Sequence, residues 1–148
     1  RPRDICIEAA VSCTSETLDL FVFSEQALNS LDSKLAHQRI KEGWELLEKR
    51  PVQTITLEKI LFQNLPEGVQ IDFLTIDTEG YDFSILQSNN WSKYRPHIIL
   101  IEILDADIEN LVINNPIYKF LKSKNYFLKA VLYNTCFFQE SRRDEKSY

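Results

Sequence analysis

The chain has 148 residues, 44% of them hydrophobic and 26% charged, with a net charge of −5. This is the length of one domain, and the apolar fraction is sufficient for a core, which argues against wholesale disorder. An acidic chain lacks the basic face that nucleic-acid binding normally needs. No apolar run approaches the roughly 20 residues of a membrane-spanning helix. We therefore expect a globular domain with no nucleic-acid partner and no membrane span.

The sequence contains no methionine and only three glycines, where an average composition gives roughly ten. Without an initiator methionine, the chain is expected to be a fragment or a processed piece of a longer protein. No two glycines lie close together, so the chain has no glycine-rich phosphate loop of either the P-loop or the dinucleotide kind.

The cysteines predict a reducing compartment. Cys6, Cys13 and Cys136 are odd in number, widely spaced and without a C-x-x-C neighbour, and there are only two histidines. A zinc site is therefore not expected. We interpret the three as small buried hydrophobic residues of a cytoplasmic protein.

The first half of the chain alternates extended and helical patterns. Two strands are predicted, one at 5–11 and one with period-two alternation at 17–23. Apolar residues near helical spacing predict an amphipathic helix over 32–49, which Pro51 would end. A short extended piece at 52–56 then leads to a helix capped by Thr56.

The second half contains the strongest buried strands. Strands are predicted at 71–76 and 97–103, with a helix at 83–87 between them, and a further helix opens at Pro116. Two closing strands form a β-hairpin, and a polar tail covers 141–148. Alternating strands and helices indicate an α/β fold with a mostly parallel sheet. We assign residues 1–140 to one partial domain.

Acidic residues mark the carboxyl end of the first central strand, where doubly wound sheets bind ligands. Asp77 and Glu79 are followed by Gly80, which permits a tight turn that directs both carboxylates into one cleft. Such a pair can bind a divalent cation or deprotonate a hydroxyl. The alternative interpretation is that Asp77 caps the next helix and Glu79 complements its dipole.

Glu102 is the third candidate, because it lies within the apolar run Ile-Ile-Leu-Ile-Glu-Ile. An unpaired charge inside such a run is costly. Glu102 must therefore have a partner, reach the end of the sheet, or have a raised pKa. A functional role and a structural ion pair both remain open.

The stretch at 71–82, Ile-Asp-Phe-Leu-Thr-Ile-Asp-Thr-Glu-Gly-Tyr-Asp, resembles the FkbM-type methyltransferase family, whose pattern is a hydrophobic run, Lys-Ile-Asp-x-Glu-Gly and a helix. Thr75 stands in the lysine place. The resemblance continues in the family's order through four further segments, at 8–12, 21–30, 55–61 and 94–103.

The resemblance implies a Rossmann-like class I methyltransferase sheet and S-adenosylmethionine as cofactor. The reaction implied is O-methyl transfer to a hydroxyl of a sugar, glycolipid or secondary metabolite. Asp77, Glu79 and Glu102 are the catalytic candidates. The residues expected to face the cofactor are Ala10, Val11, Ser12, Asp77 and Gly80.

The chain departs from the family pattern at its start. The family's Asp-x-Gly-Ala-x-x-Gly loop and the acidic residue that holds the ribose have no counterpart here. We therefore expect the isolated chain to be inactive, to bind the cofactor weakly and to self-associate through an exposed sheet edge.

Two other functions remain open. One is a non-catalytic α/β module that binds a partner or an acceptor. The other is a metal-dependent glycosyltransferase in which Asp77 and Glu79 hold the metal.

Overall fold

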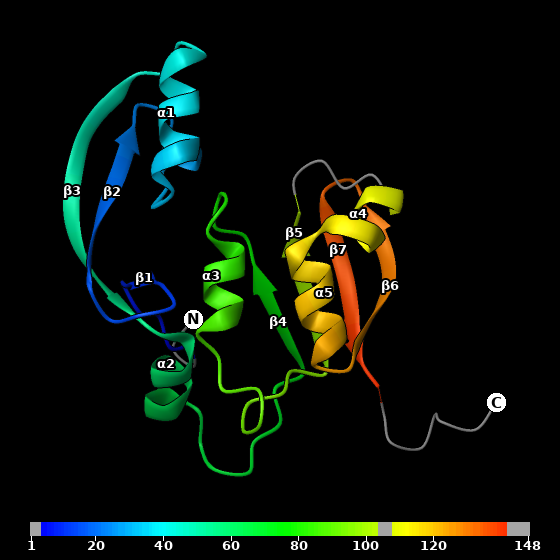
Figure 1. The fold of residues 1–148 in the computed structure, drawn as a ribbon. Coiled ribbons are helices and arrows are strands. Elements are labelled where there is room, and N and C mark those ends of the chain that lie inside the picture. Colours follow the sequence, from blue (N-terminus) through cyan, green and yellow to red (C-terminus); the bar gives the residue numbers. More distant parts are fainter. Residues whose placement is uncertain (1–3, 104–107, 142–148) are drawn as a thin grey trace. The chain divides into compact units, whose positions relative to one another are not determined.

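The computed structural model describes residues 4–103 and 108–141, and they form two compact units. Unit 1 contains the chain up to residue 67 together with 78–89. Unit 2 contains 68–77 and the chain from residue 90 onward. Figure 1 shows the helices and strands of both units. The α/β class predicted from the sequence is confirmed.

Unit 1 contains a three-stranded sheet and three α-helices. The strands are β1 (Ala10–Val11), β2 (Thr17–Phe23) and β3 (Leu46–Ile55), in the order β1-β3-β2. β3 is parallel to β1 and antiparallel to β2. A short 3₁₀ turn (Gln26–Leu28) follows β2, and the α-helices are α1 (Ser33–Lys41), α2 (Leu57–Asn64) and α3 (Asp82–Gln87).

The core of unit 1 lies between β2 and α1. Phe21, Phe23 and Ala36 are buried there, and Leu28 and Leu46 pack against them. Side-chain caps define where the helices begin. Asp32 accepts the backbone N–H groups of Lys34 and Leu35 at the start of α1, and Thr56 accepts the N–H of Lys59 in α2. The predicted Thr56 cap is thus confirmed.

Unit 2 contains a four-stranded sheet with two helices. The strands are β4 (Phe73–Ile76), β5 (Ile98–Glu102), β6 (Tyr126–Leu132) and β7 (Thr135–Glu140), in the order β4-β5-β7-β6. β4 and β5 are parallel, and β7 is antiparallel to both of its neighbours. The helices are α4 (Ile108–Asn114) and α5 (Pro116–Ser123). The predicted closing hairpin is confirmed.

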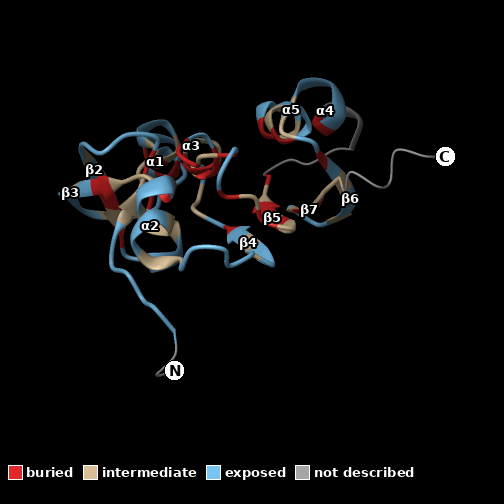
Figure 2. Cartoon of the chain, turned by 90° about the horizontal axis from the view of Figure 1, so that it is seen from below, coloured by how far each residue is buried: buried red, intermediate tan, exposed pale blue. Residues whose placement is uncertain are grey.

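The central strand β5 carries much of the core of unit 2. Figure 2 shows buried residues on β5, where Ile99 and Ile101 are fully buried. Tyr126 is buried as well, and its hydroxyl donates to the carbonyl of Pro96 over 2.6 Å. Arg95 forms an ion pair with Glu140 and donates to the carbonyl of Lys124. These contacts join the start of β5 to the closing hairpin.

The predicted helix over 32–49 is wrong. α1 ends at Lys41, and Gly43 follows with a φ of 97°. The chain then enters β3, in which Lys49 pairs with Phe21 and Pro51 pairs with Asp19. Pro51 is tolerated because β1 pairs with β3 only at Thr54 and Ile55, which leaves β3 one neighbour at the proline.

Four other expectations differ from the structure. The strand expected over 5–11 pairs only at Ala10 and Val11. Helix α4 was not predicted. Cys6 and Cys13 are exposed, and only Cys136 is buried as expected. Among the described strands, three of five pairings are antiparallel, so the structure shows two mixed sheets where one mostly parallel sheet was expected.

Other expectations are untested. The assignment of 1–140 to one domain and self-association through a sheet edge stay predictions. Residues 142–148 of the expected tail lie outside the described residues. Within residues 4–103 and 108–141, no helix combines the length and hydropathy needed to cross a membrane.

Candidate functional site

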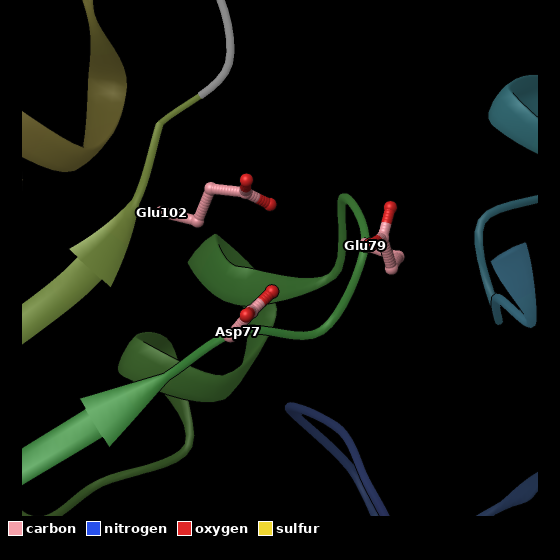
Figure 3. A group of neighbouring side chains, drawn as sticks. All are labelled: Asp77, Glu79 and Glu102. Carbon is pink, nitrogen blue, oxygen red and sulfur yellow. The ribbon is translucent and has the colours of Figure 1, made fainter. Parts of the chain in front are cut away.

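Asp77 and Glu102 lie close together at the carboxyl ends of two neighbouring strands in unit 2. Ile76 and Ile101 are register partners in the parallel strands β4 and β5, and each acidic residue directly follows one of them. Register partners in parallel strands direct their side chains to the same face. A carboxylate oxygen of Asp77 accordingly lies within 4.8 Å of one from Glu102. Figure 3 shows both carboxylates beyond the strand ends.

The two carboxylates differ in environment. Asp77 is exposed and Glu102 is half-buried. Glu102 is also the register partner of Thr135 in β7, so its backbone is held by that strand. Two neighbouring carboxylates repel each other unless a proton or a cation lies between them. The pair can therefore accept a proton from a bound hydroxyl or contribute oxygen ligands to a divalent cation.

Asp82, rather than Asp77, organises the loop after β4. Its carboxylate accepts the backbone N–H groups of Thr78 over 3.3 Å and Gly80 over 3.2 Å. Burial raises the pKa of Asp82, partly opposed by these hydrogen bonds. The N-cap residue of α3 is Tyr81. The interpretation of Asp77 as the helix cap is therefore wrong, and its carboxylate is not used in this way.

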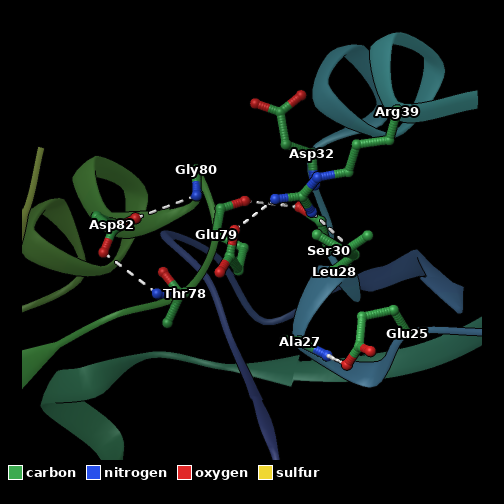
Figure 4. A network of polar contacts seen from close by, with 10 residues as sticks. All are labelled: Glu25, Ala27, Leu28, Ser30, Asp32, Arg39, Thr78, Glu79, Gly80 and Asp82. Atoms are coloured by element: carbon green, nitrogen blue, oxygen red, sulfur yellow. Dashed lines mark hydrogen bonds and ion pairs between the residues drawn. The ribbon is translucent and has the colours of Figure 1, made fainter. Parts of the chain in front are cut away.

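Glu79 is held within unit 1 by α1 and the segment before it. Its carboxylate forms an ion pair with Arg39, and its carbonyl accepts a hydrogen bond from the Ser30 hydroxyl over 2.9 Å. Arg39 also donates to the carbonyl of Leu28 over 2.6 Å. Figure 4 shows the guanidinium joining these groups. The carboxylate of Glu79, which precedes the first turn of α3, is thus engaged by Arg39.

Two consecutive residues of this loop have left-handed backbone conformations. The φ angles are 53° at Glu79 and 94° at Gly80. The first is uncommon for a residue with a side chain, and such conformations cluster at functional sites. At Gly80, an added Cβ would lie 3.0 Å from Cδ2 of Leu35. The φ angle thus favours glycine at position 80, as expected for a sharp turn, and a larger residue would require the Leu35 side chain to move.

The three residues expected to face the cofactor at β1 are not equivalent. Ala10 and Val11 are half-buried, whereas Ser12 is fully buried and donates its N–H to the carbonyl of Ile55. In the described part of unit 1, β1 is an edge strand that pairs only with β3. Ala10 and Val11 therefore present a second backbone edge that pairs with no described strand, whereas the Ser12 side chain is buried.

Comparison with protein families decides the wider assignment. The family described as the methyltransferase FkbM domain matches residues 1–128. The chain belongs to this family. No curated protein and no solved structure gives a match.

Membership of the FkbM family points to methyl transfer in general. It confirms the resemblance carried by Asp77, Glu79 and Gly80. It favours methyl transfer over glycosyl transfer with a metal bound by Asp77 and Glu79. The carboxylate of Glu79 is also engaged by Arg39.

The sequence analysis missed Arg39, Ser30 and Asp82. A signal for Arg39 was present, because it lies three residues after Ala36 on the apolar face of α1, and both are buried. An arginine on such a face needs an acidic partner. Asp82 follows Gly80-Tyr81, a position from which an aspartate commonly accepts preceding backbone N–H groups. No local pattern indicated Ser30, whose contact with Glu79 spans 49 residues.

Proposed function

We propose that the protein transfers the methyl group of S-adenosylmethionine to a hydroxyl of a sugar, glycolipid or secondary metabolite. Family membership supports methyl transfer. The observation that carries the choice of a hydroxyl is the pair of carboxylates, Asp77 and Glu102, at the ends of adjacent parallel strands. We further propose that both sheets belong to a Rossmann-like class I methyltransferase fold in a cytoplasmic protein.

Asp77 is the general base in this proposal. The described residues make no hydrogen bond or ion pair to its carboxylate, and the side chain is exposed at a strand end. A rigid strand end fixes a catalytic group more precisely than a loop does. Asp77 would accept the proton of the acceptor hydroxyl as that oxygen is methylated.

Glu102 supports this transfer from the neighbouring strand. Its half-buried carboxylate lies close enough to Asp77 to bind the same hydroxyl or to share the proton that Asp77 receives. Glu79 has a different role, because its ion pair with Arg39 fixes the loop that follows Asp77. We therefore divide the three acidic candidates into a base, its partner and a positioning residue.

S-Adenosylmethionine supplies an electrophilic methyl group on a sulfonium centre. The free edge of β1 at Ala10 and Val11 is proposed to contact its adenine, and the Asp77–Gly80 loop to contact the remainder. The chain has no glycine-rich loop, so these residues account for only part of a cofactor site.

The direct test is transfer of a labelled methyl group from S-adenosylmethionine to an acceptor panel by the full-length protein. The panel contains neutral glycosides, glycolipids and hydroxylated aromatic compounds, and the products are identified by mass spectrometry. Label on a hydroxyl oxygen supports the proposal. Label on nitrogen or carbon, or no transfer to any acceptor at saturating cofactor, contradicts it.

The same assay decides the metal question and the rival function. Loss of transfer on addition of a chelator, restored by Mg²⁺ or Mn²⁺, assigns a metal to Asp77 and Glu102, whereas unchanged transfer assigns proton transfer alone. A non-catalytic module is indicated by an acceptor that binds the full-length protein but is never methylated.

A further inference from the structure

Unit 1 contains a cleft of about 460 Å³ between β2, the start of α1 and the residue that precedes α3. This volume lies in the range of small-molecule binding sites. Leu18, Asp19 and Phe21 line it from β2. Lys34 lines it from the first turn of α1, Asp32 from the N-cap before that helix, and Tyr81 completes it. All of these residues belong to unit 1.

The cleft lies next to Gly80, in the loop that precedes α3. Tyr81 directly follows Gly80, and a Cβ at Gly80 would lie 3.8 Å from Oδ2 of Asp32 in the cleft wall. Tyr81 is also four residues after Asp77.

The polar groups of the cleft suit a ligand that donates hydrogen bonds. Oδ1 of Asp32 accepts the N–H groups of Lys34 and Leu35. No hydrogen bond from a described residue engages Oδ2 of Asp32 or the carboxylate of Asp19. Carboxylates accept hydrogen bonds without donating any, so vicinal hydroxyl groups are natural partners.

The remaining lining selects further among hydroxylated ligands. Leu18 and the Tyr81 side chain offer apolar surface, which suits the C–H face of a sugar ring. The lining has two carboxylates, Asp19 and Asp32, against one ammonium group, that of Lys34. This surplus of negative charge disfavours acidic sugars and phosphate esters.

We propose that this cleft binds the acceptor, and that the acceptor is a neutral sugar with adjacent free hydroxyls. Asp19 and Asp32 bind the hydroxyls, and Tyr81 packs on the ring. Identifying the bound sugar as the acceptor rests on the proposed methyl transfer. Binding of a sugar in the cleft does not depend on catalysis.

Binding is tested first without cofactor, on the chain labelled with ¹⁵N. It is titrated with the methyl glycosides of glucose, galactose, mannose, fucose and rhamnose. We expect at least one glycoside to shift amide signals of Asp19, Lys34 and Tyr81. The matching uronic acid should bind at least several-fold more weakly. Octyl and methyl glycosides should bind alike if the ring alone is recognised, whereas tighter octyl binding would assign a glycolipid source.

Two variants and two matched controls locate the site. Asp19→Ala should weaken binding about tenfold, the effect of losing one good hydrogen bond, and Tyr81→Ala should weaken binding because the ring that packs on the sugar is lost. Asp72→Ala and Tyr133→Ala remove an exposed carboxylate and an exposed aromatic ring elsewhere and should leave binding unchanged. Absence of any glycoside binding, tighter binding of uronic acids, or equal affinity in Asp19→Ala and wild type would overturn the proposal.

Failure of this proposal and failure of the proposed function give different results. If the protein methylates a glycan and Asp19→Ala leaves the KM unchanged, the cleft is not the acceptor site, and the proposed methyl transfer still stands. If glycosides bind in the cleft but the full-length protein transfers no methyl group to them, the sugar-binding site is supported and the proposed methyl transfer is contradicted.

Discussion

Arg39 and Glu79 form an ion pair in which the arginine side chain is 8% exposed and the glutamate side chain 31% exposed. The pair joins α1 to the loop between β4 and α3 across 40 residues of sequence. Because Arg39 also donates to the carbonyl of Leu28, it ties three separate segments together. The left-handed conformation of Glu79 is maintained by this contact and by the Ser30 hydroxyl.

We expect Arg39→Met to lower the free energy of unfolding by about 1.5–3 kcal/mol, the range for hydrogen bonds to charged groups. The loss stays in this range because the partner, Glu79, keeps access to water. The matched control is Arg50→Met, which breaks the ion pair of Arg50 with Glu48, where both side chains are about half exposed. The control should cost less than about 1 kcal/mol. Equal losses in urea denaturation would show that the buried pair has no special role.

Gly80→Ala should destabilise the protein more than Gly43→Ala does. Both glycines have positive φ angles, so an alanine at either position costs roughly 1–2 kcal/mol. Only at Gly80 would the new Cβ meet another atom, Cδ2 of Leu35, at 3.0 Å, because nothing lies within 4 Å of the corresponding position at Gly43. The comparison is made by thermal unfolding of the two variants. A larger loss at Gly43 would contradict the close packing of the loop on α1.

Most helices and strands that depend only on a local pattern of neighbouring residues could be predicted from the sequence. The buried strands β4 and β5, the closing hairpin and the Thr56 cap all arise from apolar runs, turns and caps that involve neighbouring residues. The segment after Lys41 shows the limit. Trp44 and Leu47 fall at helical spacing, but the positive φ of Gly43 and the pairing of Lys49 with Phe21 place them outside the helix. Such pairing depends on residues distant in sequence and leaves no local signal.

The candidate site was predictable to a similar degree. Position at a strand end identified Asp77, and parallel register explains why Glu102 lies beside it. The roles of Glu79 and Asp82 depend on where Arg39, Thr78 and Gly80 place their donors. That placement follows from tertiary packing, so spacing alone could not distinguish a catalytic carboxylate from one that fixes the loop.

Asp82 should make stability depend on pH with a definite sign. Burial raises the pKa of Asp82 in the folded state. Below the ordinary pKa of aspartate, both the folded and the unfolded state carry the proton. As the pH rises through the raised pKa, the unfolded state loses the proton more readily, so the carboxyl increasingly favours unfolding.

The measurement is the free energy of unfolding of the wild type and of Asp82→Asn from about pH 3 to about pH 6, which spans the aspartate range. We expect the wild-type value minus the variant value to fall as the pH rises. A difference that increases with pH would mean that the hydrogen bonds from Thr78 and Gly80 outweigh burial.

Glu102→Gln should reduce methyl transfer by the full-length protein more than it reduces stability. The glutamine preserves the shape of the side chain but removes the charge that is proposed to assist Asp77. We expect kcat to fall by about tenfold or more, while the melting temperature changes by only a few degrees. A large drop in melting temperature with kcat retained would assign Glu102 a structural role at the edge of β5.

The most direct test of the account is the rate of methyl transfer by Asp77→Asn in the full-length protein, measured in single turnover with saturating cofactor. Loss of the base should lower this rate by about 10²–10⁴-fold, with cofactor affinity little changed. Asp72→Asn, which alters an exposed aspartate at the opposite end of the same strand segment, should retain the wild-type rate. A wild-type rate in Asp77→Asn would contradict the assignment of Asp77 as the catalytic base.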